Sequence, residues 1–336
     1  LGLLYAAITA WLGFAVNEGE YKVMGLAAFG QPRFRDVFDG LITLSPDGSF
    51  SLDPARFAHF TDPDRGFGPG LVALLGPPRA PGLPWDPQAP DFQRRADVAA
   101  TLQVVTEDAL LGLARRLHER TGATKLCLAG GVALNAVANR RLQDEGPFEA
   151  VYVHPAAGDA GGALGAALLG AVDAGDTLHG GFSPFLGLGA DVGRTRAVAR
   201  ELGLSVETIE PDGIAALLEQ GALVGLCTGR CEWGPRALGH RSLLANPLDA
   251  GTRNRINHAV KHREPFRPFA PAVSDRAFGD WFTGQPDAMT PCMTTVCRVL
   301  RPQALGAVTH VDGTARVQSV PPSDDLLAAV LEQIPV

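Results

Sequence analysis

The chain has 336 residues, of which 46% are hydrophobic and 19% charged, so it is long enough for two domains and its composition excludes a disordered chain. The net charge of −7 argues against a general nucleic-acid binder, and the longest run of small apolar residues, 161–172, is too short to span a bilayer. No secretory signal pattern opens the chain, and its five cysteines show neither a disulfide framework nor paired metal spacing, so we expect reduced thiols in a cytoplasmic protein.

The first predicted element is a strand-like apolar run over residues 1–16, followed by a charged stretch. Residues 17–25 read NEGEYKVMG and combine two carboxylates, Lys22 and two glycines. Lysine pairs with phosphate and carboxylates orient water or a metal ion, so this stretch could hold a nucleotide or its metal. The alternative is a charged turn that caps a helix.

A long helix is predicted over residues 91–121, after a loop-rich region over residues 36–91. Its apolar residues recur at three- and four-residue steps, as in Val98, Leu102 and Val105, which is the spacing of one buried helix face. The glycine that follows is expected to end the helix.

A short strand over residues 125–129 then leads into Gly130 and Gly131, and into a helix that carries Asn135. Glycines let backbone N–H groups approach a ligand, and a helix N-terminus adds partial positive charge, so this turn could bind a phosphate or a ribose. The alternative is an ordinary glycine-rich corner.

A second unit of the same kind follows, with a strand over residues 151–153 and a helix over residues 163–172. Asp159 lies between them in a glycine-rich loop, where it could ligate a metal or cap the helix. Repetition of strand, glycine loop and helix predicts an α/β fold.

The second half begins after a boundary rich in glycine and proline over residues 175–189. Its predicted elements are a helix over 193–202, a strand over 205–209, a helix over 212–220, a strand over 223–227 and a helix-like run over 324–333. Between Arg230 and Arg267, eight Arg and Lys stand against three acidic residues, a balance of +5 that leaves −12 for the rest. A basic island in an acidic protein indicates a small anionic ligand rather than a polymer.

The basic island contains GRCEWGPRALGHRS over residues 229–242 and KHREPFRPF over residues 261–269. Its first three arginines lie in a loop shaped by glycine and proline. A guanidinium group can bind two oxygens of a phosphate or carbamoyl group at once. The alternative is a surface network of ion pairs. A last stretch, THVDGTAR over residues 309–316, carries His310, which could touch substrate or be structural.

Six of these stretches, in this order and spacing, resemble the O-carbamoyltransferase family of nodulation-factor and antibiotic-tailoring enzymes. They are GEYKVMGLA (19–27), GGVALN (130–135), GDAGGALGAA (158–167), GPRALGHRS (234–242), REPFRPFAPAV (263–273) and THVDGTARVQ (309–318). The resemblance runs essentially from end to end, and six ordered motifs make chance similarity implausible.

The resemblance implies an α/β protein of two halves. Residues 1–178 would be part of an ASKHA-type, glycoprotease-like domain that holds a nucleotide and an iron-like divalent metal. This half would pass the carbamoyl group to a hydroxyl of a small molecule such as a sugar or an aminoglycoside. Residues 183–336 would be a YrdC-like domain that joins ATP and carbamoyl phosphate into carbamoyl-adenylate. No nucleic-acid or membrane partner is implied, and a homo-oligomer stays open.

The resemblance also implies roles for single residues. Asp159 matches the family's metal-binding aspartate. Four residues match nucleotide-contacting positions, namely Lys22, Gly130, Gly131 and Asn135. Five basic residues fall in the region of carbamoyl phosphate and the adenylate, with His310 near the same pocket: Arg230, Arg236, Arg241, Lys261 and Arg263.

Two departures from the family pattern define the alternatives. The family's histidine metal ligands lie upstream of GEYKVMGLA, where no such pair precedes residue 1, and an Asn-Thr-Ser-Phe-Asn-type motif belongs beyond residue 336. We therefore expect both ends to be cut and the chain to be an internal piece, which could be inactive by itself. The other alternative is a non-catalytic ASKHA-type module that binds ATP without any dependence on carbamoyl phosphate.

Overall fold

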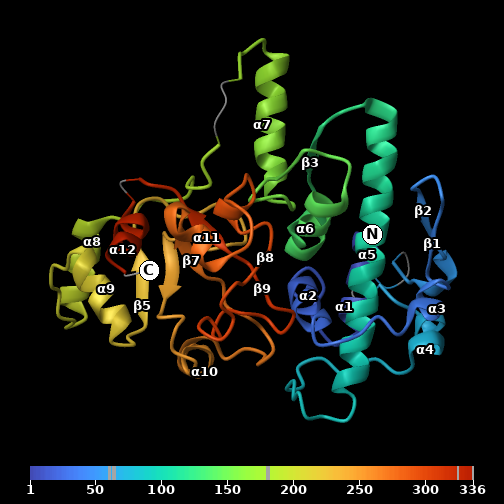
Figure 1. The fold of residues 1–336 in the computed structure, drawn as a ribbon, viewed down its shortest axis with the longest axis horizontal. Helices are drawn as coiled ribbons and strands as arrows, with labels where there is room; N and C mark the ends of the chain where they lie inside the picture. The colour runs from blue at the N-terminus through green and yellow to red at the C-terminus, as the bar shows by residue number, and fades with distance from the viewer. Residues whose placement is uncertain (60–61, 63–65, 179–181, 324, 335–336) are drawn as a thin grey trace. The chain divides into compact units, whose positions relative to one another are not determined.

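A computed structural model describes residues 1–59, 62, 66–178, 182–323 and 325–334, and the chain divides into two compact units (Figure 1). Unit 1 comprises residues 1–152, 257–268 and 310–314, and unit 2 comprises residues 153–256, 269–309 and 315–336. The expected boundary between residues 178 and 183 includes residues 179–181, which lie outside the described residues. A division of domains at that point stays a prediction.

Unit 1 is mainly helical, and its longest element is α5 (Phe92–Thr121). The predicted apolar stripe is confirmed, because Val98, Leu102 and Val105 are buried in the core of this unit. Gly122 ends the helix with a left-handed φ of 65°, a conformation that glycine adopts without strain. The other elements are α1 (Gly2–Trp11), α2 (Glu20–Ala27), α3 (Arg35–Phe38), β1 (Ile42–Leu44), β2 (Phe50–Leu52), η1 (Pro54–Arg56), α4 (Pro69–Leu75), β3 (Lys125–Leu128), η2 (Gly131–Leu134), α6 (Ala136–Glu145), β4 (Ala150–Val153) and the π-helix η3 (Asn257–Lys261).

The strand-like run expected over residues 1–16 is wrong, because most of it forms helix α1. Leu4, Ile8 and Trp11 lie on one face of α1 and are buried together with residues of α2 and α5. An apolar run that is not interrupted by polar residues shows neither a helical nor a strand periodicity. Its packing partners therefore decide between strand and helix. Figure 1 shows α1 and α2 beside the lower part of α5.

Unit 2 contains short paired strands with helices around them. Strand β5 (Val224–Cys227) pairs antiparallel with β6 (Arg241–Leu244), and β7 (Ala272–Ser274) pairs parallel with β10 (Gln318–Val320). Helix α12 (Leu326–Gln333) packs against α9 (Pro211–Glu219). The remaining elements are α7 (Gly161–Asp173), α8 (Val192–Glu201), α10 (Thr252–Ile256), η4 (Asp275–Ala277), α11 (Phe278–Trp281), η5 (Thr290–Cys292), β8 (Cys297–Arg298) and β9 (Thr314–Ala315).

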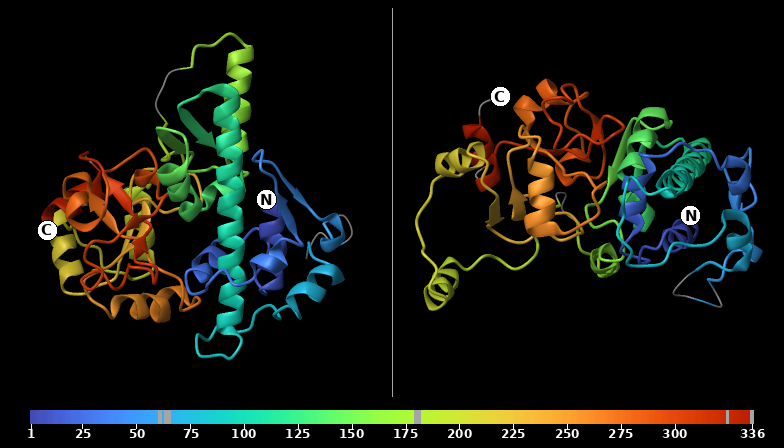
Figure 2. Two further views of the ribbon diagram at one scale, coloured as in Figure 1. Left: turned by 45° about the vertical axis from the view of Figure 1, so that its right-hand side comes forward. Right: turned by 90° about the horizontal axis from the view of Figure 1, so that it is seen from below.

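Most predicted elements of the second half are confirmed, but the strand expected over residues 205–209 is wrong. Those residues are exposed and have no strand structure, since no neighbouring strand supplies hydrogen bonds. The right-hand view in Figure 2 shows the preceding helix, α8, standing apart from the strands of unit 2, and α8 buries none of its residues. The mixed helix and strand content is confirmed, whereas the likeness to ASKHA and YrdC domains stays a prediction.

The helices within the described ranges are all too short or too polar to span a bilayer.

Candidate functional site

The basic loop, which we define as residues 229–241, leads from β5 into the first residue of β6. It contains three of the predicted arginines. Gly234 has a φ of 125°, and a Cβ at this position would lie 2.8 Å from the carbonyl oxygen of Pro155. Only glycine fits both constraints, so the loop passes this point in a fixed conformation just before Arg236.

Arg230 binds backbone carbonyl groups. Its Nη2 donates to the oxygen of Leu186 at 2.8 Å, and its Nε donates to the oxygen of Gly187 at 3.0 Å. Residue 189 also forms an antiparallel bridge to Arg230. The side chain therefore ties the segment before α8 to the basic loop, and its predicted role toward an anion stays a prediction.

Arg241 pairs with a carboxylate. Its Nε donates to Oε2 of Glu232 at 3.0 Å and its Nη2 donates to the oxygen of Gly234 at 2.7 Å. The side chain of Glu232 is fully buried. Part of the basic island is thus the ion-pair network that was the alternative to a ligand site.

Arg236 and Arg316 both belong to unit 2, and the positive charge of Arg316 acts on that of Arg236. Both side chains are half-buried, and the Nε atom of each is shielded from solvent. Burial, and then the positive charge of Arg316, push the pKa of Arg236 well below its ordinary value of 12.5. An arginine keeps its proton in proteins, so burial and the neighbouring positive charge both make the charged form of Arg236 less favourable than in water.

Cys292 lies near Arg236. Burial raises the pKa of its thiol to about 11, against the opposing effect of Arg236. The thiol is therefore protonated at neutral pH. Sequence reasoning missed Arg316, although it lies in the THVDGTAR stretch, because only the fold reveals its proximity to Arg236.

The anchored segment, which we define as residues 257–268, belongs to unit 1 and holds two further predicted cations. Arg263 donates from Nε to Oδ1 of Asn257 at 3.0 Å and from Nη2 to the oxygen of Pro268 at 3.1 Å. Lys261 is the exposed last residue of the π-helix. The five predicted cations therefore do not all lie in one unit.

Lys22 contacts the anchored segment through an ion pair with Glu264, with Nζ 2.7 Å from Oε1. Burial raises the pKa of Glu264, but the hydrogen bond to Lys22 and further interactions outweigh it, so the net pKa lies below its ordinary value. The stretch before α2 is a charged turn, in which Glu20 accepts hydrogen bonds from the backbone N–H groups of Asn17 and Gly19, but no side chain caps the helix. A nucleotide contact by Lys22 stays a prediction.

His310 lies in unit 1, with its ring edge-on to the ring of Phe29 at a centroid distance of 5.5 Å. Its Nδ1 lies 3.8 Å from Oδ1 of Asp312. These contacts fit the structural alternative, and contact with substrate stays a prediction.

The glycine turn of unit 1 leaves its backbone accessible. No atom would lie within 4 Å of a Cβ at Gly130 or Gly131 beyond their chain neighbours, so a ligand can approach this backbone closely. Asn135 is buried instead: its Oδ1 caps α6 by accepting from the N–H of Ala138 at 3.1 Å, and its amide exchanges hydrogen bonds with Gln103. Asn135 thus has a structural partner for each of its polar atoms.

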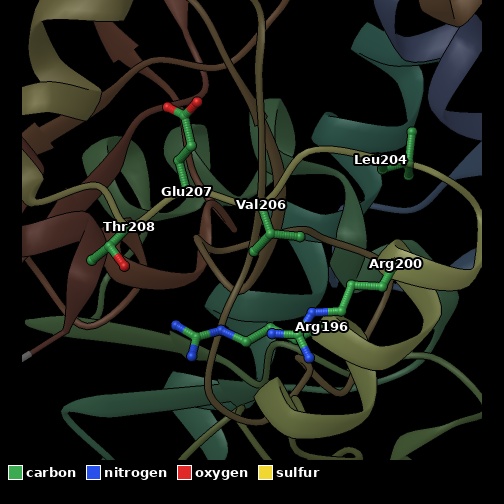
Figure 3. Close-up of a pocket in the computed structure, with 6 residues that line it drawn as sticks. All are labelled: Arg196, Arg200, Leu204, Val206, Glu207 and Thr208. Carbon is green, nitrogen blue, oxygen red and sulfur yellow. The ribbon is translucent and has the colours of Figure 1, made fainter.

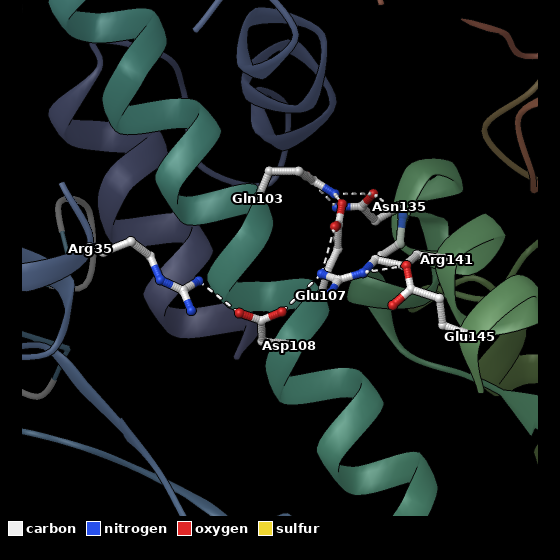
Figure 4. A network of polar contacts seen from close by, with 8 residues as sticks. Arg35, Gln103, Glu107, Asp108, Asn135, Arg141 and Glu145 are labelled. Atoms are coloured by element: carbon white, nitrogen blue, oxygen red, sulfur yellow. Dashed lines mark hydrogen bonds and ion pairs between the residues drawn. The ribbon is translucent and has the colours of Figure 1, made fainter. Parts of the chain in front are cut away.

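Figure 4 shows that the amide pair of Gln103 and Asn135 continues into a network of charges between α5 and α6. Gln103 donates to Glu107 at 2.7 Å, and Arg141 donates to both Glu107 and Asp108. Burial, the largest effect, raises the pKa of Glu107, and the hydrogen bonds from Gln103 and Arg141 oppose this effect. This network fixes the helix that follows the glycine turn.

Asp159 is exposed in the turn before α7. It does not cap that helix, because the N-cap is Ala160 and no side chain caps it. Across the described ranges no group of three or more His, Cys, Asp or Glu gathers as a metal site would require. A single carboxylate does not fit a complete divalent-metal site, and the ligand role of Asp159 stays a prediction.

A hollow of about 300 Å³ lies beside α8 and contains none of the predicted residues (Figure 3). Its lining residues are Arg196, Arg200, Leu204, Val206, Glu207 and Thr208. All six lie along the exposed stretch around the failed strand prediction, and the hollow is open to solvent, so it is no candidate for the site.

Comparison with known sequences covers both units. A profile described as carbamoyltransferase N-terminus matches residues 1–168, and one described as carbamoyltransferase C-terminus matches residues 215–335. The nodulation protein NolO of Bradyrhizobium diazoefficiens is 38% identical over 95% of this chain and 57% of its own length. The uncharacterized protein sll1178 of Synechocystis sp. is 39% identical over 96% of this chain and 57% of its own length.

The name of a third similar protein describes an enzyme. The 3'-hydroxymethylcephem-O-carbamoyltransferase of Amycolatopsis lactamdurans is 37% identical over 60% of this chain and 38% of its own length. The chain spans 57% of the length of the first two of these relatives and less of the third.

Proposed function

The chain belongs to the carbamoyltransferase family, and we propose that it is part of an ATP-dependent O-carbamoyltransferase. The enzyme takes a carbamoyl group from carbamoyl phosphate and passes it through carbamoyl-adenylate to a hydroxyl group of a small molecule. The name of the cephem relative, which refers to a hydroxymethyl group, supports a hydroxyl as the acceptor.

The proposed chemistry balances with one water molecule. Water hydrolyses carbamoyl phosphate to carbamate and inorganic phosphate, and a carbamate oxygen then displaces pyrophosphate from the α-phosphorus of ATP. The acceptor oxygen then attacks the carbamoyl carbon, loses its proton and expels AMP. Carbamoyl phosphate and ATP are already activated and negatively charged. The protein must therefore chiefly position the reactants and neutralise this charge.

The pair of Arg236 and Arg316 is the observation that carries this proposal. Two guanidinium groups that repel each other in a partly desolvated place are well suited to a phosphate dianion, which each can bind through charge-assisted hydrogen bonds. Such bonds contribute roughly 1.5–3 kcal/mol each. Arg236 lies in GPRALGHRS and Arg316 in THVDGTARVQ, so each arginine belongs to one of the six motifs.

Binding of carbamoyl phosphate to the purified chain, measured by calorimetry, tests the proposal. We expect saturable binding that Arg236→Ala and Arg316→Ala each weaken about ten- to hundredfold. Arg255→Ala is the matched control, because that arginine forms an exposed ion pair with Asp249 in the same unit. Binding of carbamoyl phosphate that is equal in all variants, or binding of ATP alone, would contradict the proposal, and the second result would favour a nucleotide-binding module without catalysis.

A further inference from the structure

A buried carboxylate lies inside the basic loop. Glu232 accepts three backbone hydrogen bonds at Oε1, from the N–H groups of Leu238 at 2.6 Å, His240 at 2.8 Å and Arg241 at 3.3 Å. Its Oε2 accepts from Nε of Arg241 at 3.0 Å. With a side chain that is 0% exposed, this carboxylate has no access to a substrate.

These bonds join the two ends of the turn that contains Arg236. The chain leaves Glu232, passes through Gly234 and Arg236, and returns to the same carboxylate at Leu238. No regular secondary structure holds residues 231–240, so the loop depends on such contacts for its shape. Without the carboxylate, several backbone N–H groups would lose their partner inside the protein, which the loop could relieve only by moving.

Glu232 also forms an ion pair with one arginine of the basic loop. It neutralises Arg241, whose guanidinium further donates to the oxygen of Gly234. Arg236 lies within the turn whose two ends the same carboxylate joins. The carboxylate thus binds Arg241 directly and sets the position of Arg236 through the backbone.

We propose that Glu232 is a positioning residue, and that Arg241 acts with it as support for the basic loop rather than as a contact to the anion. This inference rests on the proposed function, because it names the residues that set the geometry of Arg236. A second support is the side chain of His240, both of whose ring nitrogens meet acceptors. Nδ1 lies 2.7 Å from the oxygen of Arg230 and Nε2 lies 2.5 Å from Oδ2 of Asp325, the N-cap of α12.

The experiment compares Glu232→Gln, Arg241→Gln and the double variant with the unchanged chain. Glutamine keeps the shape and one oxygen acceptor, but its amide opposes Nε of Arg241, so the single variant is expected to fold with a disturbed loop. Glu219→Gln is the matched control, because Glu219 is exposed on α9 of the same unit. Two readouts are taken, namely amide hydrogen exchange over residues 238–241 and the Kd of carbamoyl phosphate.

We expect Glu232→Gln to speed exchange at these amides at least tenfold and to raise the Kd about tenfold, with the control unchanged. The double variant is expected to bind more tightly than the product of the two single losses predicts, because it removes the mismatched pair together. Faster exchange with an unchanged Kd would reduce Glu232 to a purely structural residue and overturn the inference. A double variant at least as weak as that product would overturn the support role of Arg241.

The exchange readout needs no ligand, so the inference and the proposed function fail in different ways. If the unchanged chain does not bind carbamoyl phosphate, the proposed function fails. If exchange at residues 238–241 is the same in Glu232→Gln and the unchanged chain, the positioning role fails whatever binds.

Discussion

The basic loop and the anchored segment both carry family-motif arginines, but they are held in place by different forces. The basic loop is organised around one buried carboxylate and a histidine. The anchored segment inserts Phe266, only 3% exposed, into the core of unit 1, where its ring contacts those of Phe14, Phe29 and Trp85.

The difference lies in what fixes each backbone. In the anchored segment apolar burial fixes it, and an ion pair between Glu264 and Lys22 adds to this burial. In the basic loop, polar contacts fix the backbone so that Arg236 comes to lie beside another arginine. Burial of apolar surface is insensitive to pH, whereas a polar support responds to the charge state of its members.

The largest expected effect comes from removing the buried ring that fixes the anchored segment. Phe266→Ala removes a buried ring from an aromatic cluster and should lower the free energy of unfolding by about 3–5 kcal/mol. Urea denaturation measures the loss. Leu83→Ala, at an exposed position of unit 1, should change stability by less than about 0.5 kcal/mol. A comparably small loss for Phe266→Ala would show that the segment is not anchored by its ring.

A smaller effect is expected from the ion pair of the anchored segment. Lys22→Met keeps the aliphatic stem but removes the charge that Glu264 binds, and should cost about 2 kcal/mol at neutral pH. The pKa of Glu264 is depressed in the fold, so its contribution is complete above the ordinary value of 4.5 and is lost as the pH falls through the folded value. The difference between the two proteins should therefore shrink in acid, and a difference independent of pH would contradict the assignment.

The smallest effect concerns His240 in the basic loop, and its contribution to stability changes with pH in the opposite direction. Burial lowers the pKa of His240, but the hydrogen bonds to Asp325 and to the carbonyl of Arg230 outweigh it, so the net pKa lies above 6.5. Its contribution, roughly 1 kcal/mol as for an ordinary hydrogen bond, is complete below 6.5 and is lost as the pH rises through the folded value.

Thermal unfolding of the unchanged chain and of His240→Gln, followed between pH 6 and pH 9, measures this effect. The advantage of histidine should decline with rising pH. An advantage that grows toward alkaline pH would mean that the ring is neutral in the fold.

The sequence was sufficient to predict those elements in which the spacing of apolar residues alone defines the secondary structure. Helix α5 has a sustained apolar period and a terminal glycine, so its bounds could be predicted to within one residue. Residues 1–16 and 205–209 lack such a pattern, and packing partners or neighbouring strands decided their structure.

The site follows the same rule. The motifs located the basic loop and Arg236, because glycine, proline and arginine there have a recognisable order. They could not reveal that the charge of Arg316 acts on Arg236, or that Glu232 is buried within its own loop. Nor could they reveal that the ring of Phe266 contacts those of Phe14, Phe29 and Trp85. Those facts depend on long-range packing, to which local sequence order is blind.

The central claim, that Arg236 and Arg316 bind the phosphate of carbamoyl phosphate, is tested most directly by NMR of the arginine Nε–H groups during a titration with this ligand. We predict that the Nε–H signals of Arg236 and Arg316 shift together and saturate, while that of Arg255 stays in place. Signals of Arg236 and Arg316 that remain unmoved up to saturating ligand would contradict it.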